Sequence, residues 1–473
     1  MSDSDLETSE KEVPAAPAEE TRLDEDDRLR PEYVDEVLAK LEAGDVEGVR
    51  ALVEPLHPAD IADLFELVDR DERRALAAAL ADLLDGDVLA EMNEWVREEL
   101  IEELEPHEVA EIAGELETDD AVALIEDMEE EEQRAVLRAL DPDDRAAIEE
   151  ALSYPEDSAG RLMRRDAVCV PEHWTVGDVI DFLRAGDDLT TDFWEVFVVD
   201  PAHRPVGTCL LSWILRTPRR IALADVMQRE QTLIPVEMDQ EEVALRFQKY
   251  ALISAAVVDQ AGRLVGMITV DDVVHIIQEE ASEDITRLSG AGDGDINQPT
   301  VAAVRTRLTW LVVNLGTAII ASSVVGLFQA EIASFALLAV LMPIVSGMGG
   351  NAGTQTLAVV VRALATNQLT SSNTTRMILR EFRIALSNGL ALGILIGVAV
   401  GVIFRNVDLG LVIGLAMLTN NIIAGLSGIL VPLTLERFRV DPAVLSAVFV
   451  TMMTDVMGFF SFLGLAALWG LAG

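Results

Sequence analysis

Five long apolar stretches in the last third of the chain constrain its fold more than any other feature. They cover about residues 310–328, 332–357, 384–404, 409–433 and 443–471. About 20 helical residues cross the ~30 Å apolar core of a bilayer, so each stretch is long enough to span it. Because backbone polar groups must be satisfied internally in a bilayer, such stretches fold as helices. The sequence therefore predicts a five-helix transmembrane domain over residues 301–473.

The acidic residues are divided very unevenly along the chain. Of the 83 acidic residues only six follow residue 300, and the formal net charge of the whole chain is −48. This charge excludes nucleic acid as a partner, because phosphates would be repelled. Three lysines against 32 arginines, with such an excess of acid, are typical of proteins from halophiles, whose cytosol holds concentrated salt. We therefore take particular carboxylates, and not the total charge, as evidence for a cation site.

One of the six late carboxylates, Asp455, lies in the middle of the fifth apolar stretch. A charged side chain at the centre of a bilayer costs about 2.5–3.5 kcal/mol unless a cation, a partner or water offsets it. Thr451 lies about one turn before Asp455, Thr454 directly precedes it, and Gly458 leaves room beside it. Since Mg²⁺ gives up its water reluctantly, one carboxylate and several neutral oxygens would suit its hydrated form. We interpret Asp455 as an ion site; a protonated Asp bonded to another helix is the alternative.

The second apolar stretch contains the segment PIVSGMGGNAGTQT, residues 343–356. Its glycines, together with Pro343, Asn351 and Gln355, predict a break in the helix. Non-helical backbone at membrane depth is tolerated where it is buried or lines a watery cavity. Exposed carbonyl oxygens and the Asn351 amide oxygen are hard ligands that suit a divalent cation. The alternative is close packing of small residues between helices.

The arginines predict the orientation in the membrane. Two arginines precede the first stretch, four lie between the second and third, and two lie between the fourth and fifth, whereas the opposite side has only Arg405. Positive loops remain in the cytosol. The sequence therefore predicts a multi-pass protein of the cytoplasmic membrane, with the N-terminus in the cytosol and the C-terminus outside.

The part before the membrane domain begins with a polar, acidic segment, residues 1–30, that we expect to be disordered. Residues 31–157 have the apolar spacing of helices. The segment LHPADIA at 56–62 recurs as LEPHEVA at 104–110 and more faintly as LDPDDRA at 140–146, with proline in the first helical turn each time. These repeats predict a superhelical stack of short helices.

Residues 158–269 predict two copies of a strand, helix, strand, turn, strand, helix pattern. The hairpins VVDPAHRPVG (198–207) and VVDQAGRLVG (257–266) match each other, and the segment resembles a tandem pair of cystathionine-β-synthase (CBS) modules. Such pairs bind adenine nucleotides or metals. The second copy keeps Gly266, Thr269 and Asp272, which the resemblance assigns to ribose and phosphate contacts, so ATP is a candidate ligand. Alternatively, Thr269 and Asp272 cap the next helix. In the first copy, Leu215 replaces the acid.

Residues 270–300 predict a charged linking helix followed by a hinge. The helical domain, CBS pair, linking helix and five spans, with GMGGNAGTQT and the fifth-span pattern DPA…TD…G, resemble the MgtE family of magnesium channels and transporters. The resemblance implies a homodimer in the lipid bilayer with one pore, and an ion site formed by Asp455, Asn351 and the backbone of Thr451. Relatives have a small residue and proline where Ala447 and Val448 stand.

The resemblance also implies that Mg²⁺ bridges carboxylates of the helical domain, the CBS pair and the linking ("plug") helix, and so holds the pore shut. The matching acids are Asp87, Asp119, Glu241, Asp272, Glu280, Glu283 and Asp284. Positions that are acidic in some relatives carry Ala123, Ala251 and His275, which weakens some of these sites. Concentrated salt screens repulsion between carboxylates, so we expect direct coordination to dominate gating.

The predicted fold class is a multidomain α and α+β membrane protein, and the predicted function is regulated Mg²⁺ uptake. The alternatives are transport of Co²⁺ or Mn²⁺, export coupled to a counter-ion, or a membrane-anchored CBS sensor that transports nothing. We predict no enzymatic activity. The sequence contains no kinase, P-loop or hydrolase signature, and an intramembrane aspartyl protease would need two carboxylates within the spans, whereas only Asp455 is present.

Overall fold

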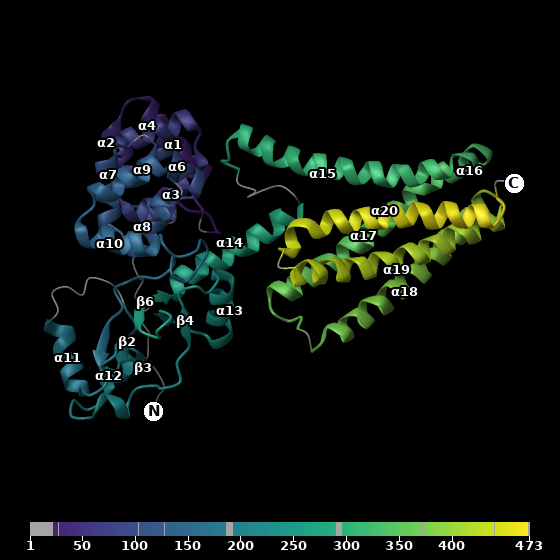
Figure 1. Cartoon of the computed structure of the whole chain (residues 1–473). Helices are drawn as coiled ribbons and strands as arrows, with labels where there is room; N and C mark the ends of the chain where they lie inside the picture. The colour runs from purple at the N-terminus through teal and green to yellow at the C-terminus, as the bar shows by residue number, and fades with distance from the viewer. Residues whose placement is uncertain are drawn as a thin grey trace, which may run out of the picture. The chain divides into compact units, whose positions relative to one another are not determined.

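This computed structural model describes residues 22–471, apart from residues 27, 103, 127, 186–192, 290–295, 371 and 439 and the side chains of Asp284, Leu288, Ser289 and Val444. Most of the predicted tail, residues 1–30, and part of the predicted hinge therefore lie outside the described residues. The chain forms two compact units, Met1–Ile276 and Ile277–Gly473 (Figure 1).

The first unit begins with a stack of short helices. They are α1 (Pro31–Glu42), α2 (Val46–Val53), α3 (Pro58–Leu67), α4 (Arg70–Ala79), α5 (Gly86–Glu91), α6 (Glu94–Ile101), α7 (Pro106–Glu115), α8 (Thr118–Ile125), α9 (Glu130–Ala139) and α10 (Pro142–Ala151). Pro58, Pro106 and Pro142 each begin a helix, as predicted, because the first turn does not use the N–H that proline lacks. The apolar faces close over a core that includes the fully buried Phe65 and Ile125.

Two small sheets of the same topology follow. The elements are β1 (Cys169–Pro171), α11 (Val176–Ala185), β2 (Glu195–Val199), β3 (Pro205–Leu210), α12 (Leu211–Arg216), the 3₁₀ turn η2 (Leu223–Asp225), β4 (Leu233–Pro235), α13 (Gln240–Tyr250), β5 (Ser254–Val258) and β6 (Leu264–Thr269). In each sheet the first strand pairs parallel with the second, and the second pairs antiparallel with the third. This repeat confirms the predicted pair of CBS folds.

The two hairpins turn in the same way. Asp200 accepts hydrogen bonds from the backbone N–H groups of Ala202 and Arg204, and Asp259 accepts the equivalent bonds two and four residues further on. Asp side chains that bond the backbone two residues ahead stabilise tight turns. The strand register shifts after Val198 in one hairpin and after Val257 in the other. The matching sequence segments therefore fold into matching turns.

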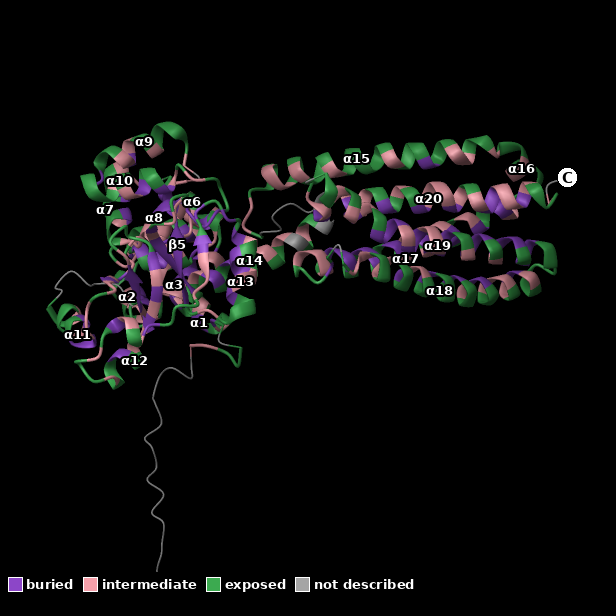
Figure 2. Ribbon diagram, turned by 60° about the horizontal axis from the view of Figure 1, so that its bottom comes forward, coloured by how far each residue is buried: buried purple, intermediate pink, exposed green. Residues whose placement is uncertain are grey.

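The second unit contains five helices that are long and apolar enough to cross a membrane. After the linking helix α14 (Val270–Ser289) come α15 (Thr300–Leu327), the short α16 (Gln329–Ser334), α17 (Leu337–Ala365), α18 (Thr374–Ile403), α19 (Val407–Arg437) and α20 (Pro442–Leu468). The predicted linking helix and five spans are confirmed. Within an 18-residue apolar segment of each helix, 56% of the residues are buried in α19 and 6% in α15. α19 is therefore the central helix of the bundle. Figure 2 shows the exposed residues along α15.

The predicted break in the second span is wrong. α17 continues as a helix from Leu337 to Ala365 through the whole glycine-rich segment. A side chain at Gly349 would collide with the Asn420 amide of α19, because its Cβ would lie 2.0 Å from the Asn420 nitrogen; a Cβ at Gly353 would lie 2.6 Å from Val450 of α20. The glycines therefore serve close helix packing, which was the alternative interpretation.

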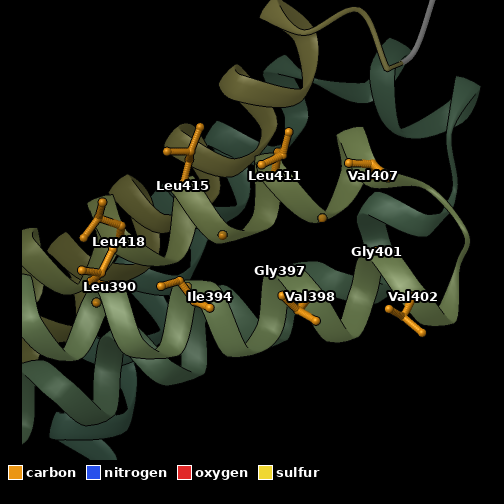
Figure 3. Close-up of a pocket in the computed structure, with 14 residues that line it drawn as sticks. Leu390, Ile394, Gly397, Val398, Gly401, Val402, Val407, Leu411, Leu415 and Leu418 are labelled. Carbon is orange, nitrogen blue, oxygen red and sulfur yellow. The ribbon is translucent and has the colours of Figure 1, made fainter.

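Glycines also bring α18 and α19 together, backbone against backbone. A Cβ at Gly393 would lie 2.6 Å from the carbonyl oxygen of Gly414, and one at Gly410 would lie 2.5 Å from that of Gly397. A groove runs along this contact, and Figure 3 shows its aliphatic side chains on both helices, such as Ile394 and Leu411. Because its lining residues are glycines and aliphatic residues, this groove offers no side-chain ligand for an ion.

Candidate ion sites

The carboxylate of Asp455 on α20 is half-buried and receives a hydrogen bond from the hydroxyl of Ser346 on α17. Sequence reasoning missed Ser346, although it lies within the glycine-rich segment of the second span. The bond joins residues that are 109 positions apart. The structure thus places a neutral oxygen donor directly beside the predicted ion-site carboxylate.

The other two predicted pore residues lie on exposed helix surface. Thr451 is exposed one turn before Asp455, and its carbonyl oxygen accepts a hydrogen bond of 2.9 Å from the buried Thr454 hydroxyl. Asn351 is exposed on α17, together with Thr354 and Gln355. Among the described residues, no hydrogen bond joins Asn351 to Asp455. The structure therefore brings α17 and α20 together at Ser346 and Asp455, and leaves the Asn351 amide free of Asp455.

Asn420 on the central helix α19 is a second polar group that sequence reasoning missed. It is fully buried, and its side-chain nitrogen donates a 2.8 Å hydrogen bond to the carbonyl oxygen of Val345. Its side-chain oxygen has no hydrogen-bond partner among the described residues. A Cβ at Gly349 or Gly458 would lie 2.0 or 2.8 Å from the Asn420 nitrogen, so both glycines are needed to admit this amide. Asn420 thus joins α19 to α17 by a hydrogen bond and packs against Gly458 of α20, next to the Ser346 and Asp455 pair.

In the first unit, two of the predicted regulatory carboxylates meet at one arginine. The Arg164 guanidinium lies 2.8 Å from Asp272 and 3.7 Å from Asp119. It also lies 2.6 Å from Glu117 and 3.0 Å from Asp271. Only 11% of the Arg164 side chain is exposed, so these charges interact with little screening by solvent. Sequence reasoning did not identify Arg164.

The carboxylates at the start of α8 are held in an unusual electrostatic environment. One oxygen from each of Glu117, Asp119 and Asp120 lies within 4.8 Å of the others, a spacing that could hold a metal ion. Burial raises the pKa of Glu117 to about 7 despite the nearby Arg164 guanidinium. Burial, with the charges of Asp272 and Asp120, raises the pKa of Asp119 well above its usual range. One oxygen of Asp119 is buried without a hydrogen-bond partner among the described residues.

The remaining predicted regulatory acids belong to helices α5, α13 and α14. Asp87 is exposed in the first turn of α5, and Glu241 lies in the first turn of α13. Glu280 and Glu283 lie on α14, where Glu283 pairs with Arg287. The side chain of Asp284 lies outside the described residues.

Two of the residues predicted to bind a nucleotide, Thr269 and Asp272, form a helix cap. The backbone N–H and the hydroxyl of Thr269 donate to one oxygen of Asp272, at 3.2 and 2.6 Å, where α14 begins. A Cβ at Gly266 would lie 2.6 Å from the carbonyl oxygen of Arg164, so this glycine allows the Arg164 segment to approach β6. A separate pocket, lined by Glu195 and Ser254, has neither Thr269 nor Asp272 among its lining residues. The cap that the alternative interpretation expected is therefore present, and nucleotide binding at these residues stays a prediction.

An ion pair ties the end of the linking helix to the helix that carries Asp455. Arg287 of α14 lies 2.9 Å from Asp441, whose other carboxylate oxygen accepts a 2.7 Å hydrogen bond from the backbone N–H of Ala443. Asp441 is therefore both the N-cap of α20 and the partner of Arg287. A displacement of this end of α14 would act directly on the start of α20.

Five membrane-length helices, a half-buried intramembrane carboxylate, a linking helix and a CBS pair define a multi-pass membrane protein of the ion-transporter class. Family profiles agree: the one described as divalent cation transporter (MgtE) matches residues 342–465, the MgtE intracellular N domain matches 56–157, and the CBS domain matches 223–279. The chain belongs to the MgtE family of magnesium transporters.

Relatives cover almost the whole chain. The magnesium transporter MgtE of Bacillus subtilis (strain 168) is 30% identical over 440 residues, which are 92% of this chain and 97% of the relative. The magnesium transporter MgtE of Thermus thermophilus is 32% identical over 436 residues, 90% of this chain and 96% of the relative. Among solved structures, the cytosolic domain of the Mg²⁺ channel MgtE in complex with ATP is 30% identical, covering 51% of this chain and 99% of that chain with a TM-score of 0.47.

Proposed function

We propose that this protein takes up Mg²⁺ across the cytoplasmic membrane through a pore beside Asp455. The single observation that carries this proposal is the half-buried Asp455 carboxylate in α20, bonded to the Ser346 hydroxyl of α17. An isolated carboxylate at membrane depth needs a compensating cation, partner or water. Membership of a family whose curated relatives are named magnesium transporters supports Mg²⁺ as the ion.

The exposed polar face of α17 supports a pore formed between two copies of the chain. Asn351, Thr354 and Gln355 are exposed on a helix that crosses the membrane. An amide that faced lipid would lose its hydrogen bonds with water, at a cost of about 2–7 kcal/mol. These side chains therefore require water or another protein surface in front of them. A homodimer with a central aqueous pore supplies both.

The chemistry of the proposed pore suits a hydrated ion. One carboxylate, the Ser346 hydroxyl, the Asn351 amide and the Thr451 backbone are few and mostly neutral oxygen ligands, which would contact the water shell of Mg²⁺ and leave it in place. Such a site contains no soft sulfur or imidazole ligand to favour Co²⁺, whereas Mn²⁺ accepts the same oxygen ligands as Mg²⁺. Competition by Co²⁺ or Mn²⁺ for uptake separates these alternatives.

The decisive experiment compares Asp455→Asn with Asp408→Asn in liposomes that contain a Mg²⁺-sensitive dye. Asp408 is the matched control because it lies in the first turn of α19 and hydrogen-bonds Trp469 near the end of the bundle. We expect Asp455→Asn to abolish uptake and Asp408→Asn to retain it. Normal uptake by Asp455→Asn would refute the pore assignment, and absence of uptake by the unaltered protein would favour a CBS sensor that transports nothing.

Regulation by Mg²⁺ at the acidic residues of the cytosolic part completes the proposal. Facing carboxylates repel one another when divalent ions are scarce and are bridged when they are plentiful. The Arg287–Asp441 pair supports a direct route from α14 to α20. With the orientation that the arginines predict, the acidic part senses cytosolic Mg²⁺ and the C-terminus lies outside. A transporter family also supports the prediction that the protein is not an enzyme. ATP binding at the CBS pair stays a prediction.

A further inference from the structure

Backbone hydrogen bonds hold the Arg164 segment in place independently of the contacts of its side chain. The Arg164 N–H donates a 2.8 Å hydrogen bond to the Met267 carbonyl oxygen, and the Met267 N–H donates a 2.9 Å bond in return. The adjacent Gly266 permits this approach, because a Cβ there would lie 2.6 Å from the Arg164 carbonyl oxygen. The segment is therefore anchored on β6, just before the start of α14.

From this anchor the guanidinium contacts the acidic starts of two helices. Glu117 and Asp119 belong to the N-cap and first turn of α8, and Asp271 and Asp272 to the first turn of α14. Acidic residues suit helix N-termini because of the positive end of the helix dipole. Two such starts that face each other bring like charges together, and a cation between them offsets the repulsion.

A divalent ion that bridged Asp119 and Asp272 would need the position that the guanidinium occupies. Arg164 contacts both carboxylates, and its side chain is 11% exposed, against 10% for Asp119 and 17% for Asp272. The residues present therefore do not fit a metal bridge between α8 and α14. A guanidinium, with its planar fork of donors and its permanent charge, forms such a bridge by itself.

We propose that Arg164 is the resident cation of this cluster and holds α8 against the start of α14 without bound metal. This inference rests on the proposed regulation by Mg²⁺ and changes which residues sense the ion. The contact between α8 and α14 does not depend on Mg²⁺, and other carboxylates of the cytosolic part bind the regulatory Mg²⁺. In concentrated salt this arrangement has an advantage, because buried pairs are screened much less than exposed ones.

The test compares Arg164→Met with Arg165→Met in the purified full-length protein. Arg165 is the matched control because it is the next residue and pairs with Glu150 of α10 instead of the cluster. Hydrogen exchange of residues 121–126 and 264–276 is measured in high KCl, with EDTA or with Mg²⁺ at about 20 mM, well above the affinity of weak carboxylate sites.

In the unaltered protein and in Arg165→Met, we expect the protection from hydrogen exchange in EDTA and in Mg²⁺ to agree within about twofold. In Arg164→Met, we expect this protection to fall about tenfold or more in EDTA, because breaking a buried ion pair leaves uncompensated charges. Mg²⁺ should restore protection in Arg164→Met. Arg164→Lys keeps the charge without the fork and should fall between the two, which provides a test even if Arg164→Met does not fold.

Two results would overturn the inference: an unaltered protein that loses protection in EDTA, or an Arg164→Met protein that keeps it. Mg²⁺ uptake is measured on the same samples and reports on the proposed function separately. Absence of uptake in the unaltered protein would refute the transport proposal while leaving the exchange result interpretable. Normal uptake by an unaltered protein whose protection from hydrogen exchange is lost in EDTA would refute the proposed role of Arg164 and leave the transport proposal standing.

Discussion

The hydroxyl of Ser346 on α17 donates a hydrogen bond to the carboxylate of Asp455 on α20. Two spans therefore meet at one carboxylate oxygen, and the position of α17 decides where that oxygen points. Ser346 orients the carboxylate through this bond, whereas Asp455 supplies the charge. The two roles can be separated by substitution.

Ser346→Ala should reduce Mg²⁺ uptake without abolishing it. A hydrogen bond to a charged group contributes about 1.5–3 kcal/mol, so we expect a loss on the order of 10-fold in the initial rate at low Mg²⁺. Ser387→Ala is the control, because the Ser387 hydroxyl bonds the Arg383 carbonyl oxygen of its own helix, α18. Uptake rates over a range of Mg²⁺ concentrations provide the measurement, and equal rates for the two variants would contradict the orienting role.

Gly393→Ala should destabilise the bundle, because the added methyl group would lie 2.6 Å from the Gly414 carbonyl oxygen, a backbone atom that cannot rotate away. Overpacking of this kind costs about 1–3 kcal/mol. Gly316→Ala on α15 is the control, since nothing lies within 4 Å of a Cβ there. Thermal unfolding in detergent should show a lower midpoint for Gly393→Ala only. Equal midpoints would mean that α18 and α19 separate easily.

The Arg287–Asp441 pair should couple the linking helix to α20 weakly. Both side chains are more than a third exposed, and exposed ion pairs contribute about 0.2–1 kcal/mol. A double-mutant cycle with Arg287→Met and Asp441→Asn compares the Mg²⁺ concentration at which transport is half-closed. The coupling between the two substitutions should change this concentration by less than about 6-fold. Asparagine at 441 keeps the N-cap of α20 while it removes the charge. Fully additive shifts would show that the two residues do not communicate.

Cys209 should resist thiol reagents in the folded protein. Burial, with the charge of Glu195, raises the pKa of the Cys209 thiol to about 11. The folded state favours the protonated thiol, so this contribution to stability is full below the ordinary thiol pKa and is lost as the pH rises through about 11. At pH 8 the reactive thiolate is roughly 100-fold scarcer than in a free thiol.

Labelling of the Cys169→Ala variant, in which Cys209 is the remaining cysteine, measures this rate. Rapid labelling under native conditions would show that the first CBS fold opens frequently. Labelling that appears only with urea would make Cys209 a specific reporter of unfolding in this part of the chain.

Features that depend on neighbours in the sequence were predicted correctly. Prolines at helix starts, paired hairpins and five long apolar stretches are local patterns, and the structure contains each of them. The break at residues 343–356 was wrong because glycine weakens a helix in isolation, by about 1 kcal/mol each, while close packing against α19 and α20 offsets that loss.

Contacts between distant residues were not predictable from one sequence. Arg164 and Asp272 are 108 positions apart, and Ser346 and Asp455 are 109 apart. A serine in an apolar helix or an arginine after a methionine has many possible partners, and only the fold selects one. Asp455 was identified because a charge within an apolar stretch is costly, and this cost is visible in the sequence. The regulatory acids, including Asp272, were identified through the resemblance to the MgtE family.

The glycine contact between α18 and α19 has a consequence for how an ion passes. Where backbone touches backbone, no side chain stands between the helices that could change rotamer and let them slide. We therefore expect α18 and α19 to behave as one fixed wall of the bundle. We expect opening and closing to involve α17 and α20, the two helices that hold Ser346 and Asp455.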